Sequence, residues 1–168
     1  QIISQTLHDT GLPSQCLILE MTENAIVSDM ERASKILTEI KKLNISIALD
    51  DFGTGYSSLA LLRELPIDIL KIDKSFVHKL GENPNDLKIV QAIIGLGENL
   101  GLTVIAEGVE TKQQVDLLTQ HGCILQQGYY FSRPVPYAAL FKLMQDSKGT
   151  ITSKDLIEVT DSESCKVC

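Results

Sequence analysis

Apolar and polar positions alternate along the chain in blocks that predict strands and helices in turn. Short apolar runs with the β-branched character of buried strands occur at 16–19, 45–49, 67–73, 103–106 and 123–125. Longer segments with apolar residues at helical spacing predict helices at 2–10, 29–43, 59–65, 85–100, 111–121 and 136–145. Polar residues dominate from residue 146 onward, and we expect a frayed tail there.

Strands separated by helices imply crossover connections and a parallel sheet, so the fold class is α/β. Polar side chains fall at or just after the carboxyl end of each of the five strands: Glu20, Asp50, Lys71, Glu107 and Gln127. This distribution favours a barrel, in which the loops after many strands converge on one mouth. A (β/α)8 barrel has eight strands, so we expect an incomplete TIM-like barrel whose N-terminal strands are missing, over residues 1–145, followed by a tail over 146–168.

Composition narrows the function classes. The chain has 168 residues, 43% hydrophobic and 22% charged, which suits one packed domain. Its net charge of −7 argues against DNA or anionic lipid as a general partner, because both bind clustered Lys and Arg. Neither a signal peptide nor a membrane-spanning run is apparent, and we expect a cytoplasmic location.

Cysteine and histidine patterns give little support to a soft metal site. Cys16 and Cys123 fall at or near strands and are predicted to be small buried hydrophobes. Cys165 and Cys168 form a C-x-x-C in the polar tail, where a redox pair, half a zinc site, a lipidation signal and an unstructured tail all remain open. The three histidines have no metal-ligand spacing, so any metal here is a hard ion bound by oxygen.

The run from Asp50 to Ser58, DDFGTGYSS, sets two adjacent carboxylates at the end of an apolar strand and then a flexible, hydroxyl-rich loop. Acids rarely end a buried strand without a cation or hydrogen-bond donors to compensate them. A metal site and an Asp-Gly turn with helix-capping serines are both compatible with this run alone.

Five ordered blocks carry a family resemblance: EMTE at 20–23, the loop at 50–59, LKID at 70–73 with Phe76, VIAEGVET at 104–111, and QGYYFSRP at 127–134. Together they resemble the C-terminal two-thirds of an EAL domain, the bacterial cyclic di-GMP phosphodiesterase family, over roughly residues 1–145.

The resemblance implies a barrel in which Mg²⁺ or Mn²⁺, two ions in the complete domain, assists hydrolysis of cyclic di-GMP to linear pGpG. Glu20 and Asp50 would be direct metal ligands, with Asp50 bridging both ions and Asp51 binding the second. Glu107 would act near the second ion through water. Lys71 would position the attacking water and offset phosphate charge, although a surface lysine paired with a nearby acid is the plainer alternative.

Three further acids and amides match the family at the edge of this site. Glu23 corresponds to a residue that supports the loop from Asp51 to Ser58 through hydrogen bonds, and Gln127 corresponds to a glutamine at the substrate rim. Glu110 matches as well, but both Glu23 and Glu110 also stand where helices begin and an acid is electrostatically favourable.

The Glu-Ala-Leu segment that names the family, an arginine after it and an asparagine on the next strand lie outside this sequence. We therefore expect little or no phosphodiesterase activity from the chain itself and a competent complete protein, with upstream sensory or signalling domains and an open question of membrane tethering. The alternative is a non-catalytic cyclic di-GMP receptor or protein-interaction module. Unpaired strand edges also predict a homodimer or a strand-exchanged oligomer.

Overall fold

The computed structural model describes residues 2–27, 29–54 and 59–146, which form an α/β fold around one parallel sheet. Its strands are β1 (Ile18–Thr22), β2 (Ser46–Phe52), β3 (Ile69–Ile72), β4 (Thr103–Ala106) and β5 (Leu125–Gln126). They pair in sequence order and all neighbours are parallel, which confirms the predicted sheet of five strands.

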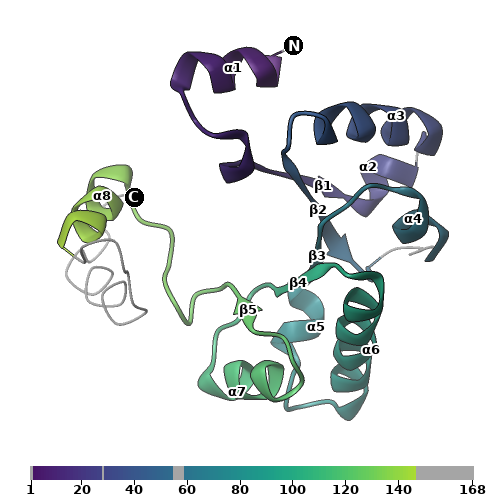
Figure 1. Ribbon diagram of the computed structural model, residues 1–168. Coiled ribbons are helices and arrows are strands. Elements are labelled where there is room, and N and C mark those ends of the chain that lie inside the picture. Colours follow the sequence, from purple (N-terminus) through teal and green to yellow (C-terminus); the bar gives the residue numbers. More distant parts are fainter. Residues whose placement is uncertain (1, 28, 55–58, 147–168) are drawn as a thin grey trace.

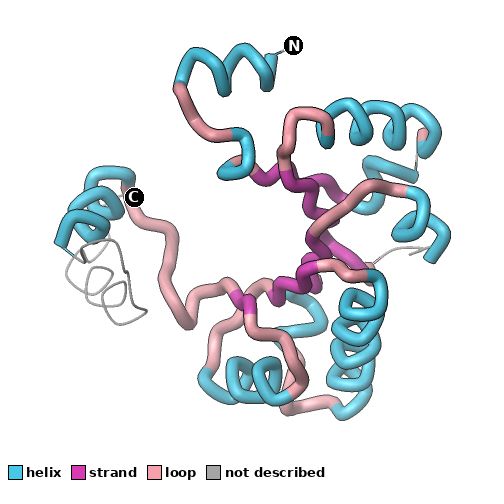
Figure 2. The backbone as a smooth tube through the Cα atoms, in the orientation of Figure 1, coloured by secondary structure: helices cyan, strands magenta, loops and turns pink. Residues whose placement is uncertain are grey.

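Helices connect the strands and lie along one side of them. They are α1 (Ile2–Thr10), the 3-10 turn η1 (Ser14–Cys16), α2 (Glu23–Val27), α3 (Met30–Lys41), α4 (Leu59–Glu64), α5 (Lys74–His78), α6 (Pro84–Leu100), α7 (Lys112–Gln120) and α8 (Tyr137–Asp146). The elements follow an arc, with α3, α4, α6 and α7 outside the row of strands, α1 beyond β1, and α8 set apart from β5 by a long connecting segment (Figure 1). The strands run down the middle of this arc (Figure 2).

The sheet face toward the helices forms the hydrophobic core. Its side chains are fully buried and lie on alternate positions of three strands: Ile47, Leu49, Leu70, Ile72 and Ala106. They pack in one cluster with apolar residues of the outer helices, including Val90 and Ile94 of α6. Burial on this scale stabilises each large aliphatic side chain by roughly 1.5–3 kcal/mol.

The opposite face of the sheet is more open and carries the polar residues. Ile18 is 47% exposed at one edge and Leu125 is 50% exposed at the other. Between them, Glu20, Asp50 and Lys71 occupy positions that alternate with the core residues. The fold therefore separates an apolar packing face from one that carries charged side chains.

Several local predictions differ from the structure. Cys16 is exposed in η1, so its prediction as a buried hydrophobe is wrong, whereas Cys123 is buried as expected. The strand predicted at 16–19 instead starts at Ile18 and continues to Thr22, because Thr22 still pairs with Asp50 of β2. The short helices α2 and α5 were not predicted, since five residues show too little periodicity.

The C-terminal helix ends close to its predicted limit. Helix α8 ends at Asp146, one residue beyond the predicted limit, and the tail from 147 with Cys165 and Cys168 lies outside the described residues. Within the described ranges, no helix is long and apolar enough to cross a membrane.

Candidate active site

A buried lysine lies at the centre of the polar face, surrounded by three carboxylates, two from β1 and β2 and one from the segment directly after β4. The Lys71 side chain is 4% exposed, and its Nζ lies 2.8 Å from Glu20 Oε2, 3.3 Å from Asp50 Oδ1 and 2.5 Å from Glu107 Oε1. We call these four residues the Lys71 cluster. The structure thus brings together four of the five residues to which the sequence analysis gave metal or catalytic roles, and the fifth, Asp51, follows Asp50 directly.

Strand register explains why these side chains meet. Residues in register on neighbouring parallel strands point to the same face, and that face recurs every second residue. Glu20 pairs with Ala48, Ala48 pairs with Ile69, and Asp50 and Lys71 each lie two residues further along. Glu107 follows β4 on the same face. Ala48 is the smallest residue in this row, which leaves space above it for the longer acids.

A β-bulge sets the geometry of the adjacent acids. Between Leu49 and Phe52, β2 has one residue more than the facing stretch of β3, and Asp51 takes a left-handed conformation with φ of 56°. Its N–H donates to Asp50 Oδ1 at 3.0 Å. Left-handed backbone is uncommon outside glycine but tolerated best by Asn and Asp. The bulge breaks the alternation that would otherwise direct consecutive acids to opposite faces.

Charge in the Lys71 cluster is unbalanced. Burial alone would lower the pKa of Lys71, but its hydrogen bonds to Glu107 and Glu20 outweigh that effect and hold the pKa above its ordinary value. Burial raises the pKa of Glu107, and the charges of Asp50 and Glu20 add to the rise despite the opposing effect of Lys71. Three carboxylates against one ammonium leave a surplus of two negative charges.

Asp73 is a fifth acid that the sequence analysis did not assign to the site. It lies beside Asp51, whose pKa is raised by burial and by the charges of Asp50 and Asp73. Hydrogen bonds from Ser75 and Lys74 at the start of α5 overcome burial and lower the pKa of Asp73. Asp73 follows Lys71 by two residues and therefore lies on the same strand face, which is the sequence feature that could have identified it.

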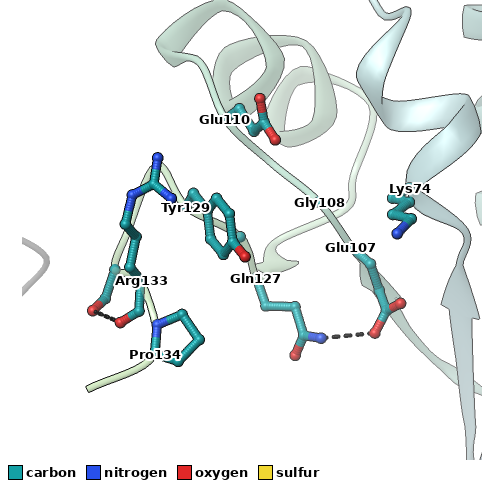
Figure 3. A pocket seen from close by; sticks show the side chains of 10 residues that line it. Lys74, Glu107, Gly108, Glu110, Gln127, Tyr129, Arg133 and Pro134 are labelled. Atoms are coloured by element: carbon teal, nitrogen blue, oxygen red, sulfur yellow. Dashed lines mark hydrogen bonds between the residues drawn. The ribbon is translucent and has the colours of Figure 1, made fainter. Parts of the chain in front are cut away.

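A pocket of about 510 Å³ lies beside Glu107, at the rim of the site. Gln127 Nε2 donates to Glu107 Oε1 at 2.7 Å, so the predicted rim glutamine is attached to the Lys71 cluster (Figure 3). Tyr129 is 53% exposed on the same wall, and the Arg133 guanidinium lies 4.6 Å from the centre of its ring. The neighbouring aromatics Tyr130 and Phe131 pack against the core instead.

The two remaining candidates are Glu110 and Glu23. Glu110 lines the pocket, and its Oε2 is 3.9 Å from His78 Nδ1. Glu23 is buried at the first residue of α2. The loop that it was expected to support includes residues 55–58, which lie outside the described ranges.

The donor set fits a hard divalent cation by its chemistry. Within residues 2–27, 29–54 and 59–146, no three His, Cys, Asp or Glu side chains are already arranged as a metal site. The carboxylates turn to Lys71 instead. Carboxylate oxygens are nevertheless the ligands that Mg²⁺ and Mn²⁺ prefer, and the surplus negative charge, with Asp51 and Asp73 beside it, calls for added cations.

Comparison with known proteins identifies the family. The model of the EAL domain family matches residues 1–134. The chain belongs to the EAL domain family. The cyclic di-GMP phosphodiesterase NbdA of Pseudomonas aeruginosa is 45% identical over 143 residues, which are 85% of this chain and 18% of NbdA. The chain thus spans less than a fifth of the length of that curated relative.

Solved EAL domains share the fold. The EAL domain of Mycobacterium smegmatis DcpA superposes with a TM-score of 0.82 at 43% identity, over 89% of this chain and 66% of that one. Klebsiella pneumoniae BlrP1, solved with manganese and cyclic di-GMP, gives 0.75 at 34% identity, over 79% of this chain and 34% of BlrP1. These EAL domains are TIM-like barrels, so the five strands described above correspond to part of such a barrel.

Proposed function

We propose that this chain carries part of the active site of a metal-dependent phosphodiesterase that hydrolyses one phosphodiester of cyclic di-GMP and releases linear pGpG. The observation that supports this proposal best is the convergence of Glu20 of β1, Asp50 of β2 and Glu107, directly after β4, on Lys71 of β3. Membership of the EAL family supplies the substrate class, and the manganese and cyclic di-GMP complex of BlrP1 supports the combination of metal and ligand.

Glu20, Asp50 and Asp51 would hold Mg²⁺ or Mn²⁺, with Glu107 acting near a second ion. Bound divalent cations lower the pKa of a coordinated water and stabilise negative charge on phosphate oxygens. Lys71 orients the attacking water and offsets charge on the phosphate, a role suited to an ammonium held by hydrogen bonds to Glu20 and Glu107 and by the charge of Asp50. Gln127 fixes Glu107 at the rim, where the pocket beside it accepts substrate.

The reaction needs parts of the barrel that this chain does not contain. In the complete family site, further ligands and a phosphate contact come from the preceding strands. Since ligand number and pre-organisation determine affinity for hard cations, the chain alone should bind metal weakly and turn over little cyclic di-GMP. The residues of the EAL-type domain would be 1–145, with 146–168 as a tail.

The test compares the chain with a form extended upstream to the length of a complete EAL domain. With Mg²⁺ or Mn²⁺, the extended form should convert cyclic di-GMP to pGpG. Asp50→Ala should lower kcat by at least about 100-fold, because losing even an outer contact to a metal ligand costs about 10- to 100-fold and Asp50 is proposed as a ligand itself. Lys88→Ala on α6, an exposed lysine away from the Lys71 cluster, is the matched control.

Two results would overturn the proposal in different ways. Turnover unaffected by Asp50→Ala would remove the metal assignment. Tight binding of cyclic di-GMP by the extended form without hydrolysis would instead establish the alternative, a non-catalytic receptor.

A further inference from the structure

A buried glutamine at the start of α7 joins two loops that carry acids of the site. The Gln114 side chain is only 4% exposed. Its Oε1 accepts from the N–H groups of Glu110 at 2.7 Å and Thr111 at 3.0 Å, and its Nε2 donates to the carbonyl oxygen of His78 at 3.3 Å. One side chain therefore connects the segment 107–111, after β4, to the last turn of α5, after β3.

Only part of this arrangement serves helix α7. Thr111 Oγ1 accepts from the Gln114 N–H at 3.2 Å, which completes a capping box with the contact from Gln114 to the Thr111 N–H. A capping box needs an acceptor at this position, and Glu or Gln supplies it equally. The donation to His78 lies outside the capping box and requires an amide.

The other end of α5 is held against the same segment. Gly108 has φ of 68°, and a Cβ added to it would lie 2.5 Å from Lys74 Cβ, so the two backbones approach as closely as a glycine allows. Between this contact and the Gln114 bridge lies a pocket of about 420 Å³, lined by α5 on one side and by Gly108 and Glu110 on the other. Helix α5 is thus fixed at both ends relative to the segment 107–111.

These two segments carry Asp73 and Glu107. Asp73 is the N-cap of α5 and contacts Asp51, and Glu107 begins the second segment and contacts Lys71. We propose that Gln114 is a positioning residue of the site, because its bridge to the His78 carbonyl fixes α5, and with it Asp73 beside Asp51, relative to Glu107 beside Lys71. This inference rests on the proposed function.

Three substitutions separate this role from helix capping. Gln114→Glu keeps the acceptor for Glu110 and Thr111 but, being ionised, cannot donate to the His78 carbonyl. Gln113→Glu makes the same charge change at the exposed neighbouring position. Thr111→Ala removes the cap on the Gln114 N–H and leaves the bridge in place.

The readouts are Mn²⁺ affinity by calorimetry, hydrogen exchange of the metal-free protein, and the urea unfolding midpoint. Gln114→Glu should weaken Mn²⁺ binding by about 10-fold, the usual cost of losing an outer contact to a metal site, and speed exchange in 74–79 and 107–111 together. Gln113→Glu should change neither. Thr111→Ala should lower the urea midpoint without changing Mn²⁺ affinity.

Faster exchange in Gln114→Glu with unchanged Mn²⁺ affinity would overturn the positioning role and leave a purely structural one. Unchanged exchange and affinity would overturn the bridge as well. If the unsubstituted chain binds no Mn²⁺, even when extended upstream, the proposed function is contradicted instead. The exchange measurement would still decide whether the Gln114 bridge couples the segments 74–79 and 107–111.

Discussion

Replacing Lys71 with Met tests whether the ammonium is the counter-charge of the site. Methionine keeps the length and apolar stem of the buried lysine but removes the partner of three carboxylates. Removing one member of a buried ion pair costs about 3–5 kcal/mol in general. Two of the partners, Glu107 and Asp50, are 16% and 22% exposed, whereas Glu20 is 52% exposed and its contact is largely screened.

We therefore expect Lys71→Met to lower the free energy of unfolding by about 3 kcal/mol at pH 7 and low salt, with under about 1 kcal/mol of that from Glu20. Lys88→Met, at an exposed position of α6, should change the free energy of unfolding by less than about 0.5 kcal/mol. Adding Glu107→Gln to Lys71→Met should recover part of the loss, because one of the unpaired charges is gone.

The loss should depend on pH with a definite sign. The pKa of Glu107 is already raised above its ordinary 4.5 by burial, so the folded state holds this proton more tightly than the unfolded state does. Ionisation of Glu107 therefore destabilises the folded state as pH rises through that raised pKa. Lys71 is the group that lowers the pKa of Glu107, so its removal makes this ionisation more costly. The deficit of Lys71→Met should thus be small near pH 4 and grow toward pH 7.

Urea unfolding followed by circular dichroism measures this directly. Equal stability of Lys71→Met and Lys88→Met at pH 7, or a deficit independent of pH, would refute the electrostatic account of the Lys71 cluster.

Other predictions concern Asp68 at the amino-terminal ends of the strands, the thiols, a close backbone contact and assembly. Asp68 accepts from the Ile47 N–H at 2.8 Å and binds Lys41 Nζ through both oxygens, so Asp68→Ala should cost about 1–3 kcal/mol in urea unfolding, and no change would refute that bracing role. Burial raises the pKa of the Cys123 thiol to about 11, so in a variant with Ser at 165 and 168 an alkylating reagent should label Cys16 well before Cys123; equal rates would contradict this. A Cβ on Gly128 would lie 2.2 Å from the Val109 backbone, so Gly128→Ala should lower the free energy of unfolding by about 1–3 kcal/mol. Gly95→Ala, where a Cβ on α6 would meet no atom within 4 Å, should not lower it. Strands β1 and β5 end the sheet, and light scattering should find a dimer or larger oligomer of the chain; a monomer at all concentrations would show that these edges are protected.

Sequence patterns predicted the sheet well because its strands are apolar runs and its longer helices, such as α3 and α6, have clear helical periodicity. The fold class followed from the alternation of the two, and the candidate site followed from polar residues at strand ends together with the resemblance to the EAL family. Glu20, Asp50, Lys71 and Glu107 could be placed on one face because side-chain alternation and parallel register fix that face without knowledge of the tertiary fold.

Features that depend on local irregularity or on contacts between distant loops could not be predicted. The bulge at Asp51 shifts the register of β2, and no residue pattern indicates a single extra residue in a strand. The contact of Asp73 with Asp51 depends on that bulge. Gln114 looks like an ordinary capping residue in sequence, and its bridge to His78 joins positions 36 residues apart.

The proposed function requires Glu20, Asp50, Asp51 and Glu107 to bind divalent cations at the carboxyl ends of the strands. Crystals of the upstream-extended form grown with Mn²⁺ would test it by anomalous scattering at the manganese edge. We predict anomalous density among Glu20, Asp50 and Asp51, with Glu107 beside it. Manganese bound elsewhere, or no anomalous density with these carboxylates still closed on Lys71 at saturating Mn²⁺, would contradict the account.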